Sequence, residues 1–138
     1  MDGDRRVLVA TYVALVLLGA MLGIWGAFLV PLRLPGGIEG LAVLIGLLGP
    51  AAAGYFGAIG AGSGPAAVMP GIGWIVAVVV LNYSRGGDVV VPGKLAVDPG
   101  IGVVGSLFFL SGLVGTLVAG VLAGRKLRRR PPSPPSGS

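Results

Sequence analysis

The chain has 138 residues, of which 54% are hydrophobic and 11% are charged, and its formal net charge is +5. A soluble domain carries about 25% charged residues, so this composition excludes an ordinary water-soluble domain and favours a membrane protein. The chain contains no cysteine and no histidine, which excludes disulfides, thiolate metal centres and the side chain best suited to proton exchange near neutral pH.

Three long segments lack any Asp, Glu, Lys or Arg and hold most of the apolar side chains. They are Val7–Leu32, Gly40–Ser84 and Pro99–Gly124. A helix needs about 20 apolar residues to cross a bilayer, so the first and last segments fit one crossing each. The middle segment fits two crossings with a break at 60–65. We therefore predict an all-α membrane fold whose domain, residues 1–124, has four transmembrane helices and short loops. The predicted spans are 7–30, 38–59, 65–83 and 100–124.

Prolines predict local features of the second and third spans. Pro50 lies in the middle of the second span and should kink it. Pro65 suits the first position of a helix, where the missing N–H has no intrahelical partner. Pro70 and Gly71 weaken the first turns of the third span, so its regular part should begin near Trp74.

The longest loop follows the third span, over residues 84–99. The β-rich triplets Val89–Val91 and Leu95–Val97 flank Pro92-Gly93-Lys94, which favours a small hairpin. The turn sequence argues equally for an irregular loop, because Pro-Gly favours a type II turn whose twist splays the strands.

Basic residues are distributed unequally between the two sides of the predicted membrane. Of the ten Lys and Arg residues, Arg33, Arg85 and Lys94 fall on the side of the loops, and the other seven fall on the side of the termini. The positive-inside rule therefore predicts that both termini are cytoplasmic and that the 84–99 loop faces outward. The seven are Arg5, Arg6, Arg125, Lys126, Arg128, Arg129 and Arg130.

The basic cluster over 125–130 should end the fourth helix and contact anionic phospholipid headgroups, rather than a nucleic acid. The residues after this cluster are rich in proline and serine. We therefore expect the segment 125–138, the cluster included, to form a disordered cytoplasmic tail.

Small residues predict helix-packing faces. They recur at i+4 spacing in the first span and in two adjacent rows of the fourth span. Such residues let membrane helices approach closely, either within one chain or against a partner subunit or second copy. The predicted packing residues are Gly19, Gly23, Ser111, Gly112, Gly115, Thr116, Ala119 and Gly120.

Glu39 is the acidic residue closest to a predicted span. It falls in the first turn of the second helix, where the positive end of the helix dipole and the headgroup layer explain its charge. The alternative is a functional carboxylate near the outer mouth of a small oligomeric transporter or channel.

The sequence offers no catalytic triad, metal-ligand set, phosphate-binding loop or paired carboxylates. We therefore expect a multi-pass membrane protein without enzymatic activity, cofactor, catalytic residues or metal site. The leading hypothesis is lateral packing in the membrane, as a homo-oligomer or as an accessory subunit of a larger complex.

Three short segments carry a resemblance. They are Gly26–Pro31 with Gly36-Gly37, Pro70–Trp74 and Gly87–Gly93. In these segments the chain resembles a family of small actinobacterial four-helix integral membrane proteins whose function is not established. The resemblance extends over about 7–124 and implies location in an actinobacterial plasma membrane. That family has no assigned catalytic or binding residues to transfer.

Overall fold

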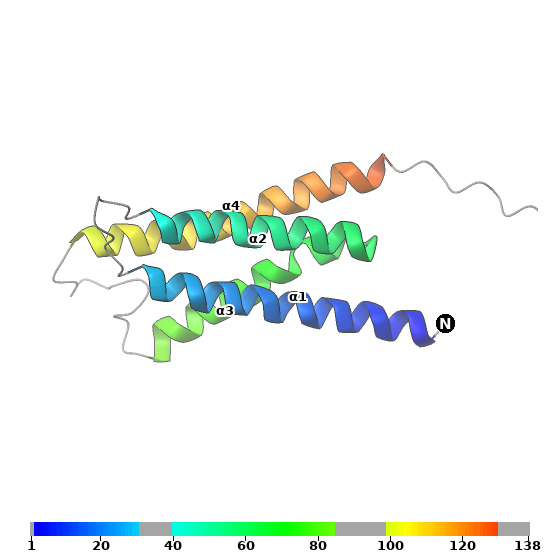
Figure 1. The fold of residues 1–138 in the computed structure, drawn as a ribbon, viewed down its shortest axis with the longest axis horizontal. Helices are drawn as coiled ribbons and strands as arrows, with labels where there is room; N and C mark the ends of the chain where they lie inside the picture. The colour runs from blue at the N-terminus through cyan, green and yellow to red at the C-terminus, as the bar shows by residue number, and fades with distance from the viewer. Residues whose placement is uncertain (1, 31–39, 85–98, 130–138) are drawn as a thin grey trace, which may run out of the picture.

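The computed structural model describes residues 2–30, 40–84 and 99–129, which form a bundle of four α-helices (Figure 1). Four helical segments, the third made of η1 and α3 together, are long and apolar enough to cross a membrane, and the described part contains no strand. This confirms the predicted all-α fold of a multi-pass membrane protein. The elements are α1 (Asp2–Leu29), α2 (Leu41–Ala61), the short 3₁₀ helix η1 (Gly64–Ala67), α3 (Met69–Ser84) and α4 (Pro99–Arg128).

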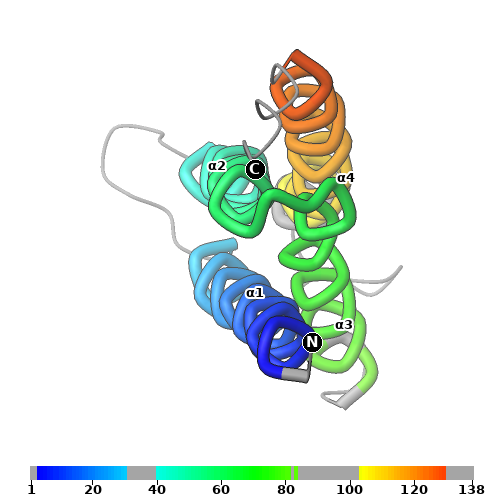
Figure 2. Tube along the Cα trace, turned by 90° about the vertical axis from the view of Figure 1, so that its right-hand side faces the viewer, coloured from blue at the N-terminus to red at the C-terminus, as the bar shows by residue number. Residues whose placement is uncertain are grey.

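Successive helices run in opposite directions, so the start of α1 and the end of α4 lie at the same end of the bundle (Figure 1). Viewed end-on, α1 lies beside α2 and α3, and α4 lies across the bundle from α1 (Figure 2). The most extensive contacts join α1 with α3 and α2 with α4. The two closest pairs are therefore parallel pairs of helices that are not consecutive in sequence.

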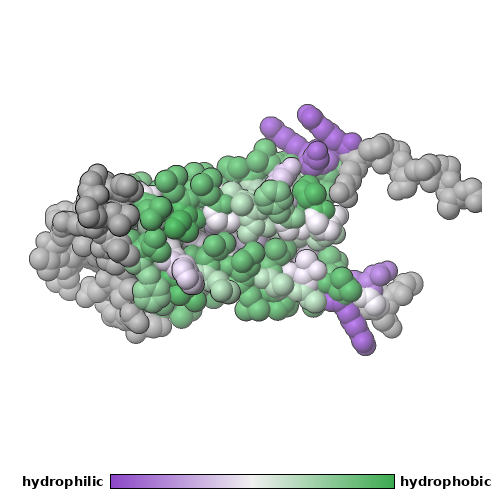
Figure 3. Space-filling view, viewed as in Figure 1, coloured by the Kyte–Doolittle hydropathy of each residue, from purple (hydrophilic) through white to green (hydrophobic). Residues whose placement is uncertain are grey.

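The outer surface is apolar along the bundle and charged at one end (Figure 3). Large side chains such as Leu17, Leu48 and Leu117 are each at least 60% exposed. Among the described residues, the charged side chains gather where α1 begins and α4 ends (Figure 3). Exposed leucine and valine over most of the surface suit contact with lipid, whereas the charged end suits the headgroup layer and water.

Both long helices continue further at the charged end than the predicted spans. α1 begins at Asp2, before the predicted start at residue 7, and its first turn contains Asp2 and Asp4. Acidic residues in a first turn interact favourably with the positive end of the helix dipole, which favours the early start. α4 continues to Arg128, so the helix ends within the basic cluster, four residues beyond the predicted end at 124, and three basic residues lie in its last turn. Cations near a helix C-terminus interact favourably with the dipole.

Glycine and proline define the boundaries of the middle helices. α2 ends at Ala61 and is capped by Gly62, whose φ of 61° is left-handed and whose N–H bonds back to the carbonyls of Ala58 and Ile59. α3 begins at Met69, earlier than the predicted regular start near Trp74. The prediction failed because Pro70 is the second residue of α3, where its missing N–H disrupts no intrahelical bond.

Two apolar clusters fill the interior. At the end of the bundle where α1 ends and α4 begins, Trp74 and Phe108 are surrounded by smaller residues from α1, α2 and α3. At the charged end the cluster consists of four buried alanines, with Tyr12 and Tyr55 packed against it. The alanines are Ala58, Ala66, Ala67 and Ala123. The helices are therefore separated by aromatic rings at one end and lie in close approach at the other.

Candidate functional site

The predicted face of α1 lies against α3. A Cβ added to Gly19 would overlap the carbonyl of Pro70, and one added to Gly23 would lie 3.0 Å from the Trp74 carbonyl oxygen. The contact is reciprocal, because a Cβ added to Gly73 of α3 would overlap the carbonyl of Val16. At Gly19 and Gly73 a carbonyl of the facing helix thus occupies the place that a side chain would take, as is typical of close contacts between membrane helices.

The predicted row of α4 that contains Ser111, Gly115 and Ala119 lies against α2. The Ser111 hydroxyl donates to the Phe108 carbonyl over 2.8 Å, and its oxygen lies where a side chain of Gly46 would be. Gly115 lies against the carbonyl of Leu47, and the methyl group of Ala119 lies 2.9 Å from the Cβ position of Gly54. The row thus packs within the chain.

Pro50 explains part of this contact. Its missing N–H leaves the Gly46 carbonyl without its usual intrahelical donor. The Gly46 oxygen lies 3.4 Å from the Cβ position of Gly115, so α4 covers the freed carbonyl closely. Neighbouring helices commonly compensate an interior proline in this way.

In the second predicted row of α4, Gly112 and Thr116 are covered by α3, whereas Gly120 is not. Gly112 lies beneath the Trp74 ring, and the Thr116 side chain lies against Gly71 while its hydroxyl donates to the Gly112 carbonyl over 2.8 Å. An added Cβ at Gly120 or Gly124 would meet no atom within 4 Å. Within the described chain there is therefore open space beside Gly120, and its assignment to a helix-packing face stays a prediction.

Sequence reasoning missed the packing face of α2. Its buried residues recur at every fourth position and face α4, η1 and the interior. The same i+4 spacing that marked α4 could have identified them. They are Ala42, Gly46, Pro50, Gly54 and Ala58.

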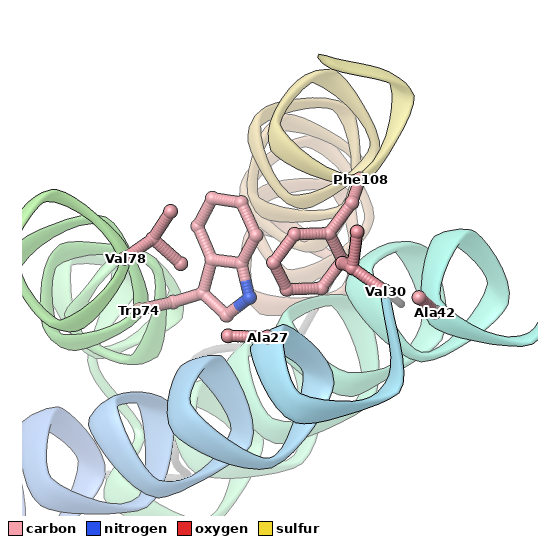
Figure 4. Packing of buried hydrophobic residues seen from close by; sticks show 6 residues of the cluster. All are labelled: Ala27, Val30, Ala42, Trp74, Val78 and Phe108. Atoms are coloured by element: carbon pink, nitrogen blue, oxygen red, sulfur yellow. The ribbon is translucent and has the colours of Figure 1, made fainter. Parts of the chain in front are cut away.

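Sequence reasoning also missed the aromatic centre of the bundle (Figure 4). The rings of Trp74 and Phe108 lie 5.1 Å apart between centroids, and both side chains are fully buried. Gly26 and Gly112 provide the space, because a Cβ on either residue would lie 2.5 Å from one of these rings. The two rings fit only because these two positions are glycines, and the four residues come from three helices, α1, α3 and α4.

The indole nitrogen of Trp74 points between Ala27 and Phe108 (Figure 4). It is buried and has no hydrogen-bond partner among the described residues. An unpaired buried donor costs about 1–3 kcal/mol. The packing of the large ring in the bundle centre offsets that cost.

The polar groups of the bundle mostly satisfy one another or the backbone. The hydroxyls of Tyr12 and Ser63 share a hydrogen bond of 2.6 Å that ties α1 to the turn before η1. Within residues 2–30, 40–84 and 99–129, no group of three His, Cys, Asp or Glu side chains could hold a metal ion. Glu39 and the proposed hairpin lie outside the described residues, so both stay predictions.

The basic cluster is divided between two faces of α4. Arg125, Lys126 and Arg129 line a cleft beside α2 with a volume of about 340 Å³. Arg128 is absent from that lining and lies on another face of the helix. Arg5 and Arg6 line a separate hollow on α1, and Arg130 lies outside the described residues.

Comparison of the chain with protein-family models, with curated proteins and with solved structures found no match.

Proposed function

We propose that the protein is a non-enzymatic component of the plasma membrane that packs laterally against a second copy of itself or against a larger membrane complex. The observation that carries the proposal is an uncovered face of α4, which we term the lateral face. It consists of Leu117, Gly120, Val121 and Gly124.

The lateral face has the shape of a helix-packing surface. Its residues follow at i, i+3, i+4 and i+7, so they share one side of α4. Leu117 and Val121 are 69% and 54% exposed, and Gly120 and Gly124 leave open space beside them. Projections beside hollows of this kind allow a second helix to approach closely, and close van der Waals contact drives helix association in lipid.

The interior of the bundle supports a role at the surface rather than along a central path. The fully buried Trp74 and Phe108 fill the interior at one level, and closely packed alanines fill it at the other. Ser111 is the buried polar residue of the described part, and its hydroxyl is bonded to the backbone. A polar path through one copy would have to displace these side chains.

Replacing Gly120 by leucine should weaken lateral packing without unfolding the bundle. The new side chain would fill the hollow of the lateral face but meets no atom of the described chain within 4 Å of its Cβ. We expect the apparent association constant to fall at least about tenfold, which corresponds to about 1.4 kcal/mol. The measurement is native gel electrophoresis and mass spectrometry of the tagged protein purified from its membrane in mild detergent.

Gly60→Leu is the matched control, because Gly60 is equally open and lies at the end of α2. It should retain whatever copy or partner the unaltered protein retains. Purification of the unaltered protein as a monomer alone, from membranes and in mild detergent, would refute lateral packing.

The charged end supports the proposed orientation with both termini in the cytoplasm. Gly3 and Gly40 belong to opposite ends of the bundle, and an added Cβ at either position meets no atom within 4 Å. Because the chain has no cysteine, single-cysteine variants can be labelled specifically. A membrane-impermeant maleimide should label Gly40→Cys in intact cells and Gly3→Cys only after permeabilisation. The reverse pattern would invert the orientation.

A further inference from the structure

A cleft at the charged end of the bundle, which we term the basic cleft, lies between α2 and the last turns of α4. Tyr55 forms its α2 wall, and one side of α4 forms the other. The α4 residues follow at i, i+3, i+4 and i+7, so they project from a single side of the helix. They are Leu122, Arg125, Lys126 and Arg129.

The positive charges of the basic cleft are not matched within the described chain. The side chains of Arg125, Lys126 and Arg129 are exposed, and none forms an ion pair with a carboxylate among the described residues. Three cations on one side of a helix repel one another. An anion bound between them would relieve this repulsion.

The side chains of the basic cleft suit a phosphate group in particular. A guanidinium donates two parallel N–H bonds to phosphate oxygens, and an ammonium adds a compact charge. Tyr55 is half-buried and packed against the alanine cluster, so its ring is held in place at the edge of the cleft. Its hydroxyl can donate one further hydrogen bond.

The apolar part of the cleft suits a lipid rather than a soluble phosphate. Leu122 lines the cleft and is 47% exposed. Val118, one turn earlier on α4, is also exposed and continues the apolar surface toward the middle of the membrane. An acyl chain on this surface would place its phosphate at the level of the cations, where each cation attracts an anionic lipid.

We propose that the basic cleft binds an anionic phospholipid whose headgroup carries more than one negative charge, such as a phosphate monoester. The phosphate lies between Arg125 and Arg129, and the acyl chain lies along Leu122. The basic cleft and the lateral face occupy different sides of α4, so lipid binding and lateral packing can each fail without the other.

The test is native mass spectrometry of the full-length protein in detergent with added dioleoyl phosphatidate. Dioleoyl phosphatidylglycerol, dioleoyl phosphatidylcholine and inorganic phosphate are compared under the same conditions. Phosphatidate should bind most tightly, and inorganic phosphate should not displace it. Arg125→Ala with Arg129→Ala should weaken phosphatidate binding about 30-fold, because each cation near an anionic lipid contributes about a factor of five.

The matched control is Arg5→Ala with Arg128→Ala, which removes the same charge from the same end of the bundle but outside the cleft. It should weaken binding less than about threefold. All four arginines are exposed, so both double variants should remain monodisperse in size-exclusion chromatography. Equal losses in the two double variants would show general charge attraction and overturn the site. Equal binding of phosphatidylcholine, or displacement by inorganic phosphate, would overturn the assignment to an anionic lipid.

Discussion

Replacing Gly73 by alanine should lower the free energy of unfolding by about 2 kcal/mol. The added methyl group would overlap the Val16 carbonyl and lie 2.9 Å from the Ala20 nitrogen, both of which belong to the backbone of α1. Backbone atoms cannot rotate away, so α1 and α3 would have to separate along their most extensive contact. Such overpacking costs about 3 kcal/mol, and the better helix propensity of alanine returns at most about 1 kcal/mol.

The measurement is unfolding of the purified protein in mixed micelles with increasing SDS, followed by tryptophan fluorescence. Gly120→Ala is the matched control, because an added Cβ there meets no atom within 4 Å. The control should leave the free energy unchanged or raise it by up to about 1 kcal/mol. Gly73→Ala should therefore lower the free energy of unfolding, whereas Gly120→Ala should not. An unchanged midpoint for Gly73→Ala would contradict the close approach of α1 and α3.

Replacing Trp74 by alanine should destabilise the bundle by about 3 kcal/mol. The substitution removes the largest fully buried side chain, together with its contacts with Phe108 and Gly112. In soluble proteins a buried Trp→Ala change costs about 3–5 kcal/mol. We expect the lower end, because lipid rather than water receives the side chain in the unfolded state, and because the variant loses an unpaired N–H.

The chain provides its own control in its other tryptophan. Trp25 is 67% exposed on α1, whereas Trp74 is fully buried, so Trp25→Ala should change stability by less than about 0.5 kcal/mol. Each variant loses one of the two tryptophans, so their fluorescence signals cannot be compared directly. The measurement is instead the fraction of monodisperse protein recovered by size-exclusion chromatography after heating. Similar losses for the two variants would contradict the central position of Trp74.

The parallel pairing of α1 with α3 and of α2 with α4 changes the meaning of the glycine rows. Gly19 and Gly23 are used against α3, and Ser111, Gly115 and Ala119 are used against α2. These residues therefore serve packing within the chain. The lateral face is the part of α4 at which small residues are left uncovered, so it is where association with a second helix can be tested cleanly.

The number of membrane-crossing helices follows from the sequence alone. Charge-free segments of sufficient length suffice for this conclusion, because a bilayer core excludes charges and requires about 20 apolar residues for each helix. The i+4 rows of small residues in α1 and α4 were also visible, because helix geometry places every fourth residue on the same side.

Tertiary structure decided what each of these residues contacts. Gly115 and Gly120 are both glycines of α4. Gly115 lies against the Leu47 carbonyl, whereas a Cβ added to Gly120 would meet no atom of the described chain within 4 Å. Likewise Arg128 and Arg129 are adjacent in sequence, but only Arg129 lines the basic cleft. Sequence periodicity places residues on a helix face, whereas the crossing and pairing of the helices determine which face is covered. Such pairing depends on contacts between distant segments, and local sequence pattern does not contain that information.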